Sequence, residues 1–246
     1  MARYWNTGDF KQPTEAEIRS RASATKKKEK FINGIATHEI NDEFARMFRG
    51  KIVFCPMKDK LIKTSKHWQD VKVYDFLNRE EMQVCNAVPT AEGAIEIAIS
   101  ETPFTLHNSN CLVLGYGKVG KILAKSLDAL GAKTYVSARK YADLALIEGH
   151  GCYPLTVSEA KSRLGEFDII FNTVPALILS KNELLHIRRD TLVIDLASKP
   201  GGVDFETAKE LGIHVVWALS LPGRVAPVTA GIIIKDTIIN MLREEV

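Results

Sequence analysis

Cys111-Leu-Val-Leu-Gly115-Tyr-Gly117-Lys-Val-Gly120 is the stretch that decides the fold of this 246-residue chain. An apolar run ends here in Gly-x-Gly-x-x-Gly, and a segment with apolar residues at helical spacing follows directly and ends at Gly131. A strand, a glycine turn and a helix in this order are the parts of a dinucleotide-binding βαβ unit. The alternative is a glycine turn in an α/β domain that binds no nucleotide.

Each glycine of the motif has its own expected role. Gly115 permits the tight turn, Gly117 lets the backbone approach a pyrophosphate, and Gly120 lets the helix pack close to the strand. The helix that begins near Lys118 and Val119 offers free N–H groups and a partial positive charge to the phosphates. We therefore expect all five residues to lie against the cofactor.

Strands and helices alternate regularly after the glycine turn. The sequence predicts helix starts at Ser158, at the capping box Ser180–Glu183 and at Asp204, and a final helix over 228–242. Strands are predicted at 133–137, 152–155, 168–173, 191–197 and 213–218. This alternation predicts an α/β fold with a doubly wound parallel sheet, a Rossmann-like domain, over residues 107–246.

The sequence before this domain is less regular. Residues 1–50 are polar and charged and stay unassigned, with a lysine run at 26–30 and a weak helical pattern over 31–48. Residues 51–106 are predicted to form a smaller, shortened α/β region that supplies part of the substrate domain. Its expected strands are 51–56, 71–75 and 84–88, followed by a helix opening at Pro89-Thr90 and a turn-rich domain boundary at 101–110.

Bulk composition excludes several classes of function. A hydrophobic content of 46%, a charged content of 26% and a net charge of +3 are typical of a soluble globular protein and do not indicate nucleic-acid binding. No apolar run is long enough for a membrane span. The four cysteines lie far apart, and no histidine makes a metal-ligand spacing with them. We expect a cytoplasmic protein with free thiols and no metal.

The end of the second strand of the domain indicates which dinucleotide is bound. NAD sites commonly carry an acid there, for the ribose 2′-hydroxyl. This chain instead has Ser137, Arg139 and Lys140, and its first acid is Asp143. A hydroxyl and two cations suit a 2′-phosphate, because guanidinium and phosphate form a charge-assisted pair. The pattern favours NADP over NAD; two surface cations at a helix start are the alternative.

Two further strand ends carry polar or glycine-rich loops at the predicted cofactor edge. One loop follows Asp195, which is costly in a buried strand unless it is hydrogen-bonded, and it includes Lys199. Lys199 and Arg224, both expected on glycine- and proline-shaped loops, are candidate ligands of an anionic substrate, although Arg224 is equally compatible with a surface position. The residues expected to contact the nicotinamide half are Asn172, Thr173, Val174, Pro175, Ala197 and Ser198, with an ordinary turn at 172–175 as the alternative.

Taken together, these motifs resemble the A subunit of bacterial dipicolinate synthase, a family of spore-forming bacteria, from about Asn86 to the C-terminus. The stretches that carry the resemblance are Asn86-Ala-Val-Pro-Thr-Ala-Glu92-Gly, Phe171-Asn-Thr-Val-Pro175, Asp195-Leu-Ala-Ser-Lys-Pro-Gly-Gly202-Val-Asp-Phe205 and Leu221-Pro-Gly-Arg-Val-Ala-Pro-Val-Thr-Ala-Gly231. The resemblance implies NADP-dependent dehydration and oxidation of hydroxy-tetrahydrodipicolinate to dipicolinate. It also implies a dicarboxylate substrate and a flavoprotein-like B subunit; we further expect a homo-oligomer.

Alternatives and departures accompany this resemblance. Another NADP dehydrogenase, of the methylenetetrahydrofolate or shikimate type, shares a similar turn and Pro-Gly loop. A nucleotide-binding partner protein without catalysis is the non-enzyme alternative. Residues 1–50 do not match the family, so a shortened first domain can leave the substrate cleft incomplete. Thr90 and Glu92 are candidate substrate contacts at the predicted helix start, against simple helix capping.

Overall fold

The computed structural model describes residues 30–32, 35–37 and 40–244, and side chains from residue 40 onward. It divides into two compact units, of which the first ends at Tyr74 and the second begins at Asp75. This division lies before the long helix that precedes the glycine turn, whereas the sequence suggested a boundary after it. The assignment of 51–106 to a substrate domain stays a prediction.

The second unit is built on one six-stranded sheet in which every neighbouring pair is parallel, in the order β10-β9-β8-β5-β6-β7. The strands are β5 (Asn110–Leu114), β6 (Lys133–Ala138), β7 (Tyr153–Thr156), β8 (Ile169–Asn172), β9 (Leu192–Asp195) and β10 (His214–Trp217). The order reverses between β5 and β8, which is the topological switch point where such sheets bind ligands. The predicted doubly wound parallel sheet is confirmed.

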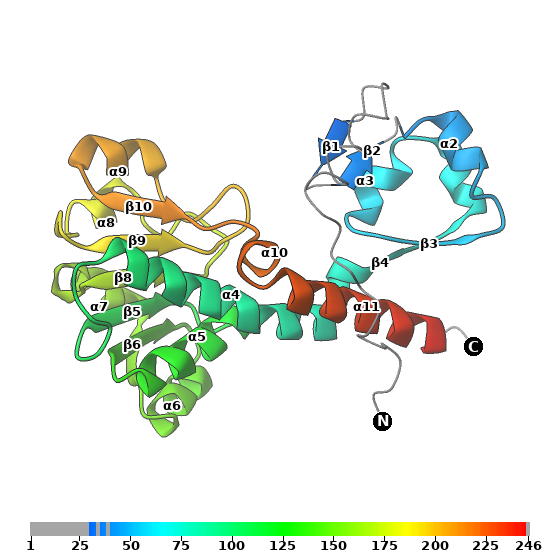
Figure 1. Cartoon of the computed structure of the whole chain (residues 1–246). Coiled ribbons are helices and arrows are strands. Elements are labelled where there is room, and N and C mark those ends of the chain that lie inside the picture. Colours follow the sequence, from blue (N-terminus) through cyan, green and yellow to red (C-terminus); the bar gives the residue numbers. More distant parts are fainter. Residues whose placement is uncertain (1–29, 33–34, 38–39, 245–246) are drawn as a thin grey trace, which may run out of the picture. The chain divides into compact units, whose positions relative to one another are not determined.

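Helices cover both faces of this sheet (Figure 1). One buried core packs α4 (Glu80–Glu101), α5 (Lys118–Ala129), α6 (Tyr141–Gly149) and α10 (Leu221–Val225) against the strands. The other packs α7 (Val157–Ser162), α8 (Lys181–Leu184) and α9 (Phe205–Leu211), with the 3-10 turn η3 (Leu164–Glu166). Burial of strand side chains on both faces explains why these strands read as continuous apolar runs.

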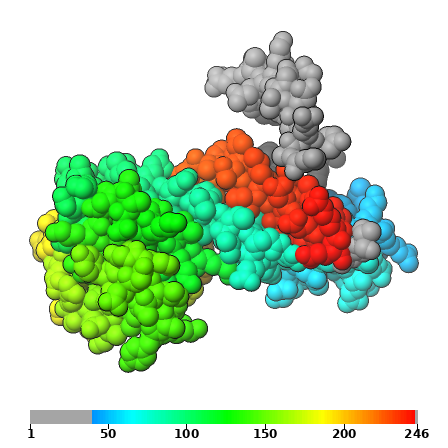
Figure 2. Space-filling model, turned by 90° about the horizontal axis from the view of Figure 1, so that it is seen from below, coloured from blue at the N-terminus to red at the C-terminus, as the bar shows by residue number. Residues whose placement is uncertain are grey.

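The last helix, α11 (Pro227–Glu244), packs along the first half of α4, which follows the 3-10 turn η2 (Phe76–Asn78). Figure 2 shows α11, in red, beside the turquoise part of α4. Arg79 donates two hydrogen bonds to the Glu244 carboxylate, at 2.6 and 2.7 Å, and the Thr237 hydroxyl lies 3.6 Å from the Met82 sulfur. The two helices therefore run antiparallel.

The predicted start of α4 was wrong. Residues 84–88 belong to the helix, which begins at Glu80 and continues through Pro89. Proline removes one helical hydrogen bond, to the carbonyl four residues earlier, and here that residue, Cys85, is exposed to solvent. Thr90 Oγ1 also donates to the Asn86 carbonyl at 2.6 Å. The helix tolerates Pro89 because the freed carbonyl lies at an exposed position.

Two other local predictions need correction. Thr156, not Ser158, caps α7, because its hydroxyl accepts from the Glu159 N–H and the Glu159 carboxylate binds back to the Thr156 N–H. The loop expected around Arg224 instead forms the short helix α10, and the final helix predicted from 228 begins at Pro227. The predicted capping box Ser180–Glu183 and the predicted helix start at Asp204 are confirmed; the helix capped by Asp204 ends at Gly212.

The Ser180–Glu183 box gives a prediction for acid stability. Burial raises the pKa of Glu183, but hydrogen bonds from Lys161 and Ser180 outweigh it and hold the pKa at about 2. A depressed folded-state pKa stabilises the protein above the unfolded value, and that contribution is lost as pH falls from about 4.5 toward 2. Glu183→Gln should therefore cost on the order of 2 kcal/mol at pH 7.

Thermal melts of the two proteins across pH check this. The gap between wild type and Glu183→Gln should close as pH falls below about 4.5. Glu206, exposed on the first turn of α9, supplies the matched control as Glu206→Gln. A gap that stays constant from pH 7 to pH 3 contradicts the assigned role of the carboxylate.

The first unit has a small core of its own. Trp68 is 3% exposed and packs with Phe44 and Phe48. The strands predicted at 51–56 and 71–75 are confirmed, but among the residues of 31–48 that the structure describes, only Asp42–Arg46 is helical. The lysine run before Lys30 lies outside the described residues.

The described elements of the first unit are β1 (Lys30–Ile32), β2 (Ile35–Thr37), α2 (Asp42–Arg46), β3 (Ile52–Cys55), α3 (Lys58–Ile62), η1 (Lys66–Asp70) and β4 (Lys72–Asp75). Strands β1 and β2 pair in antiparallel orientation, and β3 pairs with β4.

Among the described helices, none combines the length and apolar character required to cross a membrane.

Candidate dinucleotide-binding site

The glycine turn has the geometry of a phosphate cradle. Gly115 has φ +97°, and a Cβ there would lie 2.7 Å from Thr173 Oγ1, so only glycine fits. A Cβ on Gly120 would lie 2.2 Å from the Gly115 carbonyl oxygen, whereas one on Gly117 would meet no atom within 4 Å. Gly115 and Gly120 thus allow close packing, and Gly117 leaves open space where a pyrophosphate can approach.

Helix α5 begins at this turn without a side-chain cap, because Gly117 is its N-cap residue. Its free N–H groups and dipole therefore point at the open space beside Gly117 and suit an anion. Lys118, predicted to contact the cofactor, lies with its ammonium 3.0 Å from Gln83 Oε1 and 3.5 Å from Glu80 Oε1. Its side chain connects the start of α5 to the first turn of α4, and Val119 is half-buried.

The second strand end presents the expected cations. Arg139 and Lys140 directly follow β6 and are exposed, and neither forms an ion pair with another described residue. The first acid beyond them, Asp143, lies in the first turn of α6. Ser137, by contrast, is 1% exposed, and its carbonyl accepts from the Gly115 N–H. The backbone of Ser137 therefore supports the glycine turn, while the two cations face solvent.

A buried hydrogen-bond network fixes the loops beyond β8 and β9. Asp195 is fully buried and accepts from Asn172 Nδ2 at 2.8 Å, the Ala197 N–H at 3.1 Å and the Gly202 N–H at 2.8 Å. Asn172 also accepts from the Val174 N–H at 3.0 Å. Asp195 has three donors for its charge, so its role in holding the loop is structural, as burial of a carboxylate requires.

The side-chain amide of Asn172 is engaged within this network, by hydrogen bonds to Val174 and Asp195. Asn172 and Ala197 are buried, and Thr173 donates its hydroxyl to the Leu114 carbonyl at 2.8 Å. Val174 is half-buried, whereas Pro175 and Ser198 are exposed. Contacts from this turn to a bound cofactor stay a prediction.

The candidate substrate residues lie on three separate elements of the second unit. Lys199 is exposed in the loop after β9, and Arg224 is exposed on α10 rather than on an irregular loop. Thr90 and Glu92 lie in the middle of α4, not at its start; Glu92 is exposed and Thr90 is half-buried. Helix α10 packs on α4 at Gly93, where a Cβ would lie 3.1 Å from Val225.

Two features of this edge were missed by reasoning from the sequence. Tyr116, inside the glycine turn, hydrogen-bonds His150 at 2.8 Å, and burial raises the pKa of its hydroxyl. Asn86 on α4 carries a buried side-chain oxygen without a partner among the described residues. Tyr116 occupies a variable position of the glycine motif, and Asn86 opens one of the stretches that carry the resemblance, but neither pattern predicts these side-chain environments, because both depend on tertiary contacts.

Other candidate chemistry lies away from this edge. A hollow of about 510 Å³ opens at the amino ends of β9 and β10, near Arg188 and His214, opposite the edge where parallel sheets bind ligands. All four cysteines are free, and burial raises the pKa of Cys111 to about 11, so its thiol stays protonated. The described residues contain no group of three or more His, Cys, Asp or Glu side chains arranged to hold a metal.

Comparison with known proteins identifies relatives that share both sequence and fold. The dipicolinate synthase A subunit from Bacillus subtilis (strain 168) is 40% identical over 173 residues, which is 70% of this chain and 58% of that protein. The chain thus matches less than two thirds of the length of this curated relative. No protein-family model matches the sequence.

Solved structures agree with this comparison. The crystal structure of the dipicolinate synthase A subunit from Bacillus halodurans has a TM-score of 0.77 and 37% identity, covering 85% of this chain and 71% of that one. A transhydrogenase from Sinorhizobium meliloti, at 15% identity and a TM-score of 0.69, covers 82% of this chain and 71% of its own and shares the fold alone. The resemblance to dipicolinate synthase A subunits is therefore confirmed, and this chain belongs to that family.

Proposed function

We propose that this chain binds NADP at the β5–α5 turn and acts as the A subunit of a dipicolinate synthase. Its reaction would convert hydroxy-tetrahydrodipicolinate to dipicolinate, in complex with a flavoprotein-like B subunit. The observation that carries the proposal is the match to solved A-subunit structures, at 37% identity and a TM-score of 0.77. The open cradle at Gly117 and the exposed cations after β6 support the choice of cofactor.

The chemistry suits the residues at this edge. Loss of water and then of a hydride and a proton would make the substrate ring aromatic, which supplies driving force. Bound NADP would accept the hydride. The chain then has to hold two planar groups together and neutralise two carboxylates, a task of orientation. We assign the carboxylates to Lys199 and Arg224, and further polar contacts to Thr90 and Glu92.

The 2′-phosphate assignment makes a direct prediction. Arg139→Ala should weaken NADPH binding by about ten- to a hundredfold, because a guanidinium–phosphate pair contributes roughly 1.5–3 kcal/mol. NADH binding should change less than twofold, since NADH carries no 2′-phosphate. Fluorescence titration of both reduced cofactors measures the two affinities.

Lys133→Ala is the matched control, because Lys133 is an exposed cation at the opposite end of β6. It should leave both affinities unchanged. Equal weakening of NADPH and NADH in Arg139→Ala would contradict a role in binding the 2′-phosphate.

Activity is tested with the purified chain, hydroxy-tetrahydrodipicolinate and NADP, with and without a B subunit. The ultraviolet absorbance of dipicolinate should appear in at least one of these mixtures. Its absence from both, in a protein that still binds NADPH, would contradict the synthase assignment and favour a nucleotide-binding partner protein without catalysis.

A further inference from the structure

Asn86 holds a buried hydrogen-bond acceptor that the fold leaves unused. Its Oδ1 atom is buried, and no donor for it exists within the described part of the chain. A buried acceptor of this kind destabilises the folded state, and most buried polar side-chain atoms in proteins are paired. We therefore expect Asn86 Oδ1 to accept a hydrogen bond from a group that does not belong to the described residues, such as a bound ligand.

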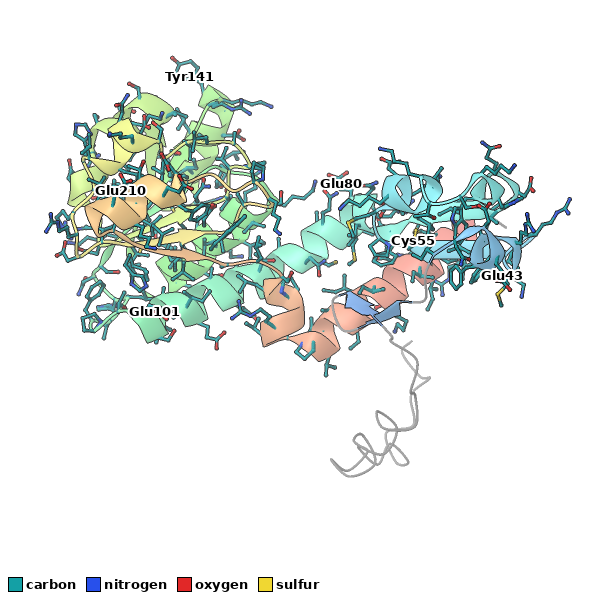
Figure 3. All side chains as sticks on the ribbon, turned by 90° about the horizontal axis from the view of Figure 1, so that it is seen from above. Glu43, Cys55, Glu80, Glu101, Tyr141 and Glu210 are labelled. Atoms are coloured by element: carbon teal, nitrogen blue, oxygen red, sulfur yellow. The ribbon has the colours of Figure 1, made fainter. Side chains whose placement is uncertain are left out.

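The position of Asn86 on α4 connects it to the cofactor edge. Three residues before it, Gln83 accepts from Lys118 at the start of α5, and seven residues after it Gly93 contacts α10. Asn86 and Thr90, one turn apart, lie between these two contacts. Glu80 and Glu101, labelled in Figure 3, mark the ends of α4, and the Glu80 half extends beyond the lobe that holds the sheet.

Topology decides which part of a dinucleotide lies below this face of α4. With the pyrophosphate at the N-terminus of α5, the adenosine half extends toward β6 and Arg139, and the nicotinamide half extends toward β8 and β9. Helix α10 follows β10 on that second side. With the cofactor in this orientation, the segment of α4 between its contacts with Lys118 and with α10 would lie over the nicotinamide half.

Chemical complementarity selects the group that binds Asn86. Oδ1 accepts hydrogen bonds only, so a substrate carboxylate, which is also an acceptor, does not suit it. The carboxamide of nicotinamide carries an NH₂ donor. Thr90 already donates its own hydroxyl proton to the Asn86 carbonyl and so supplies no donor to Oδ1. We propose that Asn86 Oδ1 accepts a hydrogen bond from the nicotinamide carboxamide; this inference rests on the proposed function.

Two ligands that differ only in the nicotinamide half test the proposal. Asn86→Leu should weaken NADPH binding by about five- to tenfold, the value of one hydrogen bond. Binding of 2′-phospho-ADP-ribose, which lacks nicotinamide, should be unchanged. The melting temperature without ligand should stay the same or rise, because leucine removes an unpaired buried acceptor. Calorimetric titration and thermal melts measure these quantities.

Glu96→Gln, an exposed substitution on the same helix, is the control and should change neither affinity. Equal weakening of both ligands in Asn86→Leu would overturn the proposal, since it would indicate a displaced helix. Unchanged NADPH binding would overturn it as well. If the wild-type chain binds 2′-phospho-ADP-ribose, the proposed cofactor stands even when Asn86 fails; if it binds neither ligand, both assignments fall.

Discussion

Replacing Asp195 with asparagine will destabilise the second unit by about 3–5 kcal/mol, the cost of breaking a buried, hydrogen-bonded charge. Both carboxylate oxygens of Asp195 accept hydrogen bonds, from Asn172, Ala197 and Gly202. An asparagine amide turns one of these acceptors into a donor. Whichever way it is oriented, its NH₂ faces at least one N–H group, and a buried donor loses its partner.

The consequence extends to the ligand edge, because this network holds the loops after β8 and β9. Gly202 also accepts through its carbonyl from the Ile178 and Leu179 N–H groups, so a displaced Gly202 loosens a second segment. Urea unfolding measures the stability. Asp190→Asn is the control: its carboxylate is exposed and pairs with Arg188 on the surface, where solvent screening leaves little net stabilisation. Similar losses in the two variants would contradict the proposed importance of the network.

The partners of Asp195 were not predictable from local sequence, although its need for partners was. Burial of a carboxylate demands donors, and that argument holds for any apolar strand. The donor Asn172 lies 23 residues away and meets Asp195 only because β8 and β9 are neighbours, with these two residues directly paired in register. Sheet order determines the contact, and sheet order is a tertiary property.

The dinucleotide unit itself was predictable because its signals are local. Glycines at 115, 117 and 120, an apolar strand before them and a periodic helix after them all indicate the same structure. Helix α4 shows the opposite case. Val84 and Val88 favour a strand and Pro89 indicates a helix start, yet packing of the neighbouring turns on α5 and α11 extends the helix back to Glu80. Tertiary packing overrode propensity there.

Substituting alanine for Gly120 will both destabilise the fold and abolish tight cofactor binding. The added Cβ would lie 2.2 Å from the Gly115 carbonyl oxygen and 3.0 Å from its carbon, and both are backbone atoms that cannot rotate away. Either α5 or the glycine turn has to move. Overpacking of this kind costs about 3 kcal/mol. Because the free N–H groups of α5 then shift from the pyrophosphate position, we expect NADPH affinity to fall on the order of a hundredfold.

Substitutions at two other glycines distinguish an effect on fold stability from an effect on NADPH binding. A Cβ on Gly117 meets no atom within 4 Å, so Gly117→Ala should keep the melting temperature but weaken NADPH binding, because its methyl group enters the space reserved for the pyrophosphate. Gly149→Ala, at the end of α6 and equally unobstructed, should change neither property. Tight NADPH binding by Gly120→Ala would show that the cofactor does not depend on the approach of α5 to β5. Unaltered NADPH binding by Gly117→Ala would indicate that the pyrophosphate does not bind beside Gly117. The three variants together thus test the role of each residue in the glycine turn.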